Sequence, residues 1–162
     1  MSEQQKIPAL ATLEEIASLL RRNDRLMGID LGTKTIGLAL SDVERRLATP
    51  LETIKRLKYT ADVGKMLDLA DKHGVVAFVI GLPLNMDGSE GPRAQSTRAF
   101  VRQTSSLARR PFVFWDERLS TAAVTRELIA QDVSRAKRAE VVDRMAAAYI
   151  LQGALDRLAR IG

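Results

Sequence analysis

The feature that most constrains this chain is an aspartate set between glycines inside a short apolar segment, MGIDLG, at residues 27–32. Side chains alternate between two faces along a β-strand, so the apolar ones would share one face, and Asp30 would lie between Gly28 and Gly32 on the other. A charge inside a strand is costly unless it is paired or binds a metal, and the glycines leave space for a ligand beside it. We therefore interpret Asp30 as a functional carboxylate. The alternative is a buried ion pair with an arginine, with the two glycines only relieving crowding or shaping a bulge.

Two further places along the chain offer carboxylates of the same kind. Asp116 and Glu117 follow the apolar segment 112–115, at the strand end where ligands of α/β sheets tend to bind, and these residues alone do not decide between them. Asp143 lies one turn before Ala146 and Ala147 in a predicted helix over 140–160, which places it on a packing face. The alternative for Asp143 is a first-turn acid stabilised by the helix dipole.

Hydrophobic periodicity predicts an α/β fold. Segments 25–31, 35–42 and about 47–55 have the pattern of strands, and Pro50 restricts the third to a sheet edge or a broken strand. Helical spacing follows at 60–73, 93–109, 121–130 and 140–160, with apolar strands at 75–80 and 112–115. We expect a mixed sheet whose first three strands are antiparallel, with helices on both faces, an order typical of ribonuclease H-like folds. A helical extension over 1–24, opened by a capping box at Thr12 and Glu15, precedes this domain at 25–162.

Composition narrows the classes of partner. Lys and Arg number 25 against 20 Asp and Glu, for a net charge of +5 and a pI near 9.9, which favours polyanions such as nucleic acid. The absence of cysteine excludes disulfides, thiolate zinc sites and cysteine nucleophiles, so a metal would be held by oxygen. Three carboxylates suit Mg²⁺ or Mn²⁺. No uninterrupted apolar stretch of about 18 residues occurs, so we expect a soluble, cytoplasmic protein without membrane contact.

Several basic residues are predicted to contact nucleic-acid phosphates, although each also fits an ordinary solvated surface. They are Lys34, Arg93, Arg118, Arg135 and Arg138. Arg135 and Arg138 fall in a polar segment that we expect to be a loop before Asp143. The glycine- and proline-rich segment 81–92 predicts an exposed loop that shapes the substrate groove or is a plain surface loop.

Four segments carry a resemblance to a known family. They are GIDLGTKTIGLALSD at 28–42, GLPLNMDGS at 81–89, DERLST at 116–121 and DRMAAAYILQ at 143–152. In this order they resemble the YqgF-type relatives of Holliday-junction resolvases, a family described as nucleases of pre-16S ribosomal RNA, over nearly everything from residue 25 onward. The resemblance implies a ribonuclease H-like fold and the metal-binding, catalytic acids Asp30, Glu117 and Asp143, and so selects Glu117 over Asp116. Thr35 departs from the family pattern, which often has arginine there.

The resemblance implies a Mg²⁺- or Mn²⁺-dependent endonuclease, a monomer or homodimer, that processes the 5′ end of pre-16S rRNA. One alternative is cleavage of branched DNA, which would call for a symmetric dimer. Another is a noncatalytic RNA-binding or transcription factor. The segment at 28–33 also resembles the first phosphate loop of actin-like and Hsp70-like ATPases, but those proteins have two such domains and a second glycine-rich loop, which we do not find in this sequence.

Overall fold

The computed structural model describes residues 9–119 and 135–161, and its centre is a five-stranded sheet in the order β3-β2-β1-β4-β5. The strands are β1 (Arg25–Leu31), β2 (Thr35–Ser41), β3 (Ala48–Lys55), β4 (Val75–Leu82) and β5 (Phe112–Asp116). β1 pairs antiparallel with β2, and β2 with β3, while β4 is parallel to both β1 and β5. This mixed arrangement confirms the predicted fold class and makes β1 the central strand.

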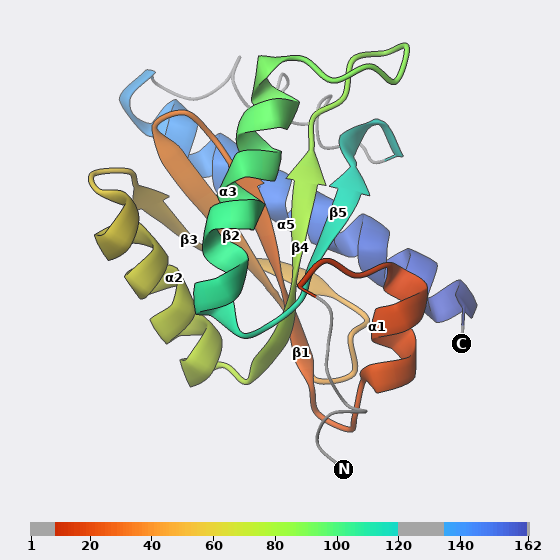
Figure 1. Ribbon diagram of the computed structural model, residues 1–162. Helices are drawn as coiled ribbons and strands as arrows, with labels where there is room; N and C mark the ends of the chain where they lie inside the picture. Colours follow the sequence, from red (N-terminus) through yellow and green to blue (C-terminus); the bar gives the residue numbers. More distant parts are fainter. Residues whose placement is uncertain (1–8, 120–134, 162) are drawn as a thin grey trace.

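Helices cover both faces of the sheet, as expected (Figure 1). α2 (Tyr59–Lys72) and α3 (Pro92–Ala108) lie on one face, and α5 (Arg135–Ile161) crosses the other. The predicted helix at 121–130 lies outside the described residues. None of the described helices is long and apolar enough to cross a membrane.

The start of α5 corrects one expectation. The helix begins at Arg135, so residues 135–138 are helical rather than a loop. The polarity of these residues indicates a loop, but arginine, alanine and lysine are all good helix formers. The earlier start also places Asp143 two turns inside α5, which excludes the first-turn explanation for this acid.

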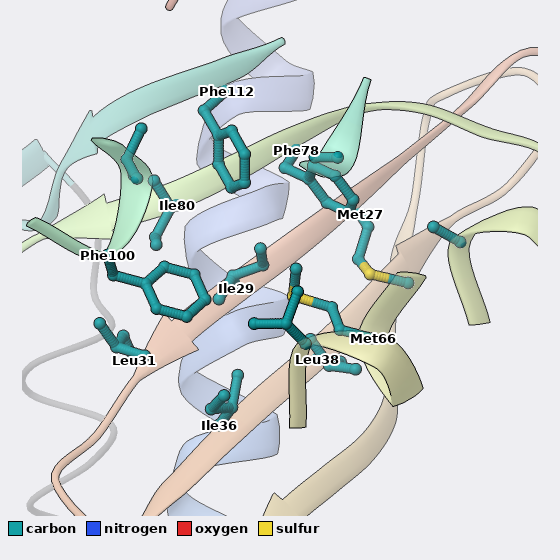
Figure 2. Packing of buried hydrophobic residues seen from close by; sticks show 14 of the residues in the cluster. Met27, Ile29, Leu31, Ile36, Leu38, Met66, Phe78, Ile80, Phe100 and Phe112 are labelled. Atoms are coloured by element: carbon teal, nitrogen blue, oxygen red, sulfur yellow. The ribbon is translucent and has the colours of Figure 1, made fainter. Parts of the chain in front are cut away.

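The face under α2 and α3 is packed with large side chains (Figure 2). The alternate residues Met27, Ile29 and Leu31 of β1 point into this cluster, as their period of two predicts. Phe78 and Phe112 stack in it with ring centroids 4.9 Å apart.

The face under α5 carries apolar side chains such as Leu26, Val79 and Trp115, with glycines between them where the helix comes close to the strands. A Cβ atom on Gly28 would lie 2.6 Å from the carbonyl oxygen of Ala147 and 2.7 Å from Cβ of Leu151, both in α5. The space beside Gly28 is therefore filled by the helix. The expectation that this glycine leaves room for a ligand is wrong, and the alternative, relief of crowding, applies to it.

Two smaller features agree with the sequence. In α1 (Leu13–Leu19) the Thr12 hydroxyl accepts from the Glu15 N–H at 3.1 Å and the Glu15 carboxylate accepts from the Thr12 N–H at 2.9 Å, which confirms the capping box. Leu13 and Ile16 are buried in the core cluster that also includes α5. β3 forms one edge of the sheet, where a proline is tolerated, and its pairing with β2 shifts register next to Pro50.

Candidate active site

Asp30 occupies a position surrounded by glycines at the centre of the sheet. It is 1% exposed, and Gly28 and Gly32 share its face along β1. Across the sheet it pairs directly with Gly37 of β2, and the parallel register with β4 places Gly81 on its other side. All four neighbours that could cover this carboxylate thus lack side chains, which leaves the space above Asp30 to groups from other elements.

One such group is Asp143 of α5. A Cβ atom on Gly37 would overlap the carbonyl oxygen of Asp143, and a Cβ atom on Gly32 would lie 3.2 Å from its carboxylate Oδ2. Because Gly32 and Gly37 both border Asp30, the half-buried Asp143 side chain is brought to the same small area of the sheet.

The other group is Glu117, which opens the short 3-10 helix η2 (Glu117–Leu119) directly after β5. Its side chain is 6% exposed, and its Oε2 would lie 2.8 Å from a Cβ atom on Gly81. Because Gly81 lies beside Asp30, Glu117 approaches the same area from the β5 side.

Asp116 turns away from this group. Its carboxylate forms a salt bridge with Arg118, with Nη2 and Oδ2 2.7 Å apart. The hydrogen bond from the Arg118 side chain holds the pKa of Asp116 below its ordinary value. Of the two acids between which the residues alone did not decide, Glu117 is the one placed with Asp30 and Asp143.

The donor chemistry of these three carboxylates fits a hard cation, because Mg²⁺ and Mn²⁺ take oxygen ligands. Within residues 9–119 and 135–161, however, no three acidic or histidine side chains already stand in an arrangement that could hold a metal ion. Mg²⁺ is usually bound through one or two carboxylates, with waters and substrate phosphates as its other ligands. A full set of three converged protein ligands is therefore not a requirement for binding.

Arg118, which the sequence marks as a nucleic-acid contact, has a structural role in the described chain. Besides its pair with Asp116, its Nη1 donates to the carbonyl oxygen of Met86 at 3.2 Å. The loop between β4 and α3 is thereby fastened to the corner after β5. Within this loop the Asp87 carboxylate accepts from the Ser89 hydroxyl and N–H, and these bonds lower the pKa of Asp87. Hydrogen bonds within the loop and from Arg118 therefore hold it in place. Contact of Arg118 with nucleic acid stays a prediction.

Of the remaining predicted basic residues, the structure describes the side chains of Lys34 and Arg93, which lie at or near the turn between β1 and β2. Lys34 lies exposed in the turn between β1 and β2. Arg93, in the first turn of α3, approaches the Leu31 carbonyl oxygen with Nη2 at 3.5 Å. The side chains of Arg135 and Arg138 lie outside the described residues. Their contacts with nucleic acid are not tested by the structure.

Arg56 is a residue near the site that sequence reasoning missed. It follows β3, its Nη1 donates to the carbonyl oxygen of Gly32 at 2.6 Å, and its N–H donates to that of Lys34 at 2.8 Å. Only the pairing of β2 with β3 reveals this position, because Arg56 lies 22 positions after Lys34 in the chain. The signal in the sequence was a basic residue at the end of a predicted strand, which is common on solvated surfaces.

Comparisons with known proteins place the chain among nucleases. A family model described as "RuvX: Holliday junction resolvase" matches residues 24–157. A protein of Beijerinckia indica named "Putative pre-16S rRNA nuclease" is 72% identical over 147 residues, which cover 91% of this chain and 89% of that protein. A protein of Methylocella silvestris with the same name is 69% identical over 93% of this chain and 96% of its own length. Among solved structures, Thermus thermophilus RuvC in complex with a Holliday junction substrate matches with a TM-score of 0.49 and 17% identity, over 83% of this chain and 96% of that one.

Proposed function

The chain belongs to the RuvX family of Holliday junction resolvases, and from this membership we propose that it is a metal-dependent endonuclease that processes the 5′ end of pre-16S rRNA. The structural observation that carries the proposal is the approach of Glu117 and Asp143 to the area around Asp30, where Gly32, Gly37 and Gly81 have no side chains. The pre-16S rRNA substrate is supported by the names of relatives that are 72% and 69% identical over nearly the whole chain.

The three carboxylates would be held by three different parts of the fold. Asp30 is buried in the central strand, so its position is fixed by the sheet. Glu117 sits on a tight corner and Asp143 on a packed helix, so both approach Asp30 from elements that the core holds in place. Together they would hold Mg²⁺ or Mn²⁺, which when bound supplies activation of a water nucleophile and stabilisation of the leaving oxygen. Lys34 lies at the mouth of the site, where its ammonium group would attract the backbone phosphates.

The test is cleavage of a labelled pre-16S rRNA fragment that contains the mature 5′ end, with Mg²⁺, Mn²⁺ or EDTA. Asp30→Asn keeps the size of the side chain and removes its charge, so we expect a folded protein whose rate falls on the order of 10³-fold, since metal-assisted charge stabilisation contributes several kcal/mol. Asp68→Asn is the matched control, because Asp68 is exposed on α2 at the opposite face of the sheet. Equal rates for Asp30→Asn and wild type would remove Asp30 from the catalytic site.

A second candidate function is cleavage of branched DNA, favoured by the description of the matching family model as a Holliday junction resolvase. A resolvase must cut two strands symmetrically, which requires a two-fold dimer. A four-way DNA junction assayed in parallel, together with the mass in solution from light scattering, separates the two. Junction cleavage by a dimer would move the assignment to branched DNA. Metal-independent binding with cleavage of neither substrate would overturn the nuclease proposal and favour an RNA-binding or transcription factor.

A further inference from the structure

A pocket opens on the other side of the β1–β2 turn from the three acids. Its volume is about 200 Å³, and it lies where residues 32–34 meet the end of β3 and the first turn of α3. Its lining consists of Leu31, Gly32, Thr33, Arg56, Pro92, Arg93, Ser96 and Thr97. Gly32 belongs to both places, because its backbone lines the pocket while its side-chain position is 3.2 Å from the Asp143 carboxylate. The pocket and the candidate active site are therefore direct neighbours.

Two arginines in this pocket are hydrogen-bonded to backbone carbonyl oxygens and are not paired with a carboxylate of the described residues. Arg56 donates to the Gly32 carbonyl oxygen at 2.6 Å, and Arg93 to that of Leu31 at 3.5 Å. Neither forms a salt bridge within the part of the chain that the structure describes. By contrast, other arginines are paired: Arg98 with Glu90, Arg110 with Asp71 and Arg118 with Asp116. A guanidinium has five N–H donors, so one bond to a carbonyl leaves most of them available to a ligand.

The rest of the lining is equally suited to an anion. Pro92 occupies the start of α3, the preceding Gly91 provides no side-chain cap, and no acidic residue stands in the first turn. No acidic side chain in the first turn of α3 therefore offsets the partial positive charge at this helix end. The exposed Ser96 adds a hydroxyl group to the lining, and none of the lining residues is acidic.

We propose that this pocket binds a backbone phosphate of the nucleic-acid strand next to the phosphate that is cleaved, with Arg56 and Arg93 as positioning residues. The proposal rests on the nuclease function proposed above. A strand that crosses the carboxyl end of β1 meets the acids on one side of the turn and the two arginines on the other. Holding the neighbouring phosphate would fix the register of the strand, so that the scissile bond lies at the acids.

The experiment measures binding of the labelled pre-16S rRNA fragment by fluorescence anisotropy in EDTA, where cleavage does not interfere, over a series of salt concentrations. Arg56→Gln and Arg93→Gln are compared singly and together. Each single variant is expected to weaken binding, and the double variant is expected to lower the slope of log affinity against log salt by about 1, the signature of one lost phosphate contact. Arg102→Gln is the matched control, because Arg102 is exposed on the same helix but does not line the pocket.

The outcomes separate this proposal from the nuclease proposal. If wild type binds and cleaves but the double variant has the same salt slope as wild type, the phosphate pocket is overturned and the nuclease proposal stands. A decrease for Arg102→Gln as large as for Arg56→Gln would show a general effect of charge and would also overturn the pocket. Wild-type protein that neither binds nor cleaves would overturn both proposals.

Two further measurements exclude a folding effect and a different ligand. Arg56→Lys keeps the charge at this position, so it is expected to retain the wild-type salt slope, and thermal unfolding reports any loss of stability in each variant. Inorganic phosphate is the second probe, and we expect it to compete with RNA for wild type but not for the double variant. A different result would overturn the assignment to nucleic acid. If the double variant loses phosphate binding but binds RNA as wild type does, the pocket is a site for free phosphate.

Discussion

The two faces of the central sheet are both buried, yet they are built from different residues. The face under α2 and α3 carries large side chains such as Phe78, Phe112 and Met27, which are fully buried. The face under α5 also carries buried apolar side chains, including Leu26, Val79 and Trp115, but Gly28 and Gly81 interrupt them, and the helix and the carboxylates approach the strands there. Large apolar residues supply stabilisation by burial, whereas glycines give up that contribution and allow close approach. Both faces therefore stabilise the fold, and the glycines of the second also allow the candidate site residues to come together.

The largest expected effect is a loss of stability when a large side chain is removed from the face under α2 and α3, as in Phe78→Ala. Phe78 is 0% exposed and stacks on Phe112, so removing its ring should lower the free energy of unfolding by about 3–5 kcal/mol. Because the ring lies on the face away from the acids, the specific activity of the folded fraction should remain near that of wild type. Urea unfolding combined with cleavage assays under folding conditions checks both. Folded Phe78→Ala protein without activity would show that the two faces do not act separately.

A smaller loss of stability with a larger loss of activity is expected for Gly28→Ala. The new Cβ would lie 2.6 Å from the Ala147 carbonyl oxygen, so α5 has to move away from β1, at about 1–3 kcal/mol. Since α5 carries Asp143, cleavage should fall by more than the unfolded fraction explains. The same pair of measurements applies, and wild-type activity in folded Gly28→Ala would mean that the helix position does not matter for the site.

Gly64→Ala is the matched glycine change with the opposite expected sign. Gly64 lies within α2, and a Cβ atom there would meet nothing within 4 Å. Alanine should therefore stabilise the helix by about 0.5–1 kcal/mol and leave cleavage unchanged. Destabilisation would indicate that the effect of Gly28→Ala reflects a general sensitivity to glycine replacement rather than crowding against α5.

The smallest effect on stability is expected at the end of β5. There the Asp116 side chain faces away from Asp30 and Asp143, and the Glu117 side chain faces toward them. The Arg118 side chain lowers the pKa of Asp116, so the pair stabilises the folded state fully above the ordinary aspartate pKa of about 4. That contribution is lost as the pH falls through the lowered pKa, because the native state must then take up a proton. Asp116→Asn should accordingly be less stable than wild type at pH 7, with the difference shrinking toward pH 3 in urea unfolding. A difference that stays constant with pH would contradict the role of this ion pair.

Much of the fold could be predicted from the sequence because its patterns are local. The alternation around Asp30, the break at Pro50 and the capping box at Thr12 each follow from residues close together in the chain. The contacts of the site could not be predicted in this way. That Gly28 makes room for α5, and that Arg56 reaches the turn after β1, depend on the pairing of distant segments. The choice of Glu117 over Asp116 came from family resemblance, and the direction of each side chain is visible only in the fold.

The central claim, that Asp30, Glu117 and Asp143 act as one metal site, is tested most directly by Mn²⁺ binding, followed by electron paramagnetic resonance without nucleic acid. We predict saturable binding to wild type and to Asp68→Asn, and a loss of at least about tenfold in affinity for Asp30→Asn, Glu117→Gln and Asp143→Asn alike, which is about 1.4 kcal/mol. Mn²⁺ binding that is absent in wild type, or that is as strong in the three variants as in wild type, would contradict the account.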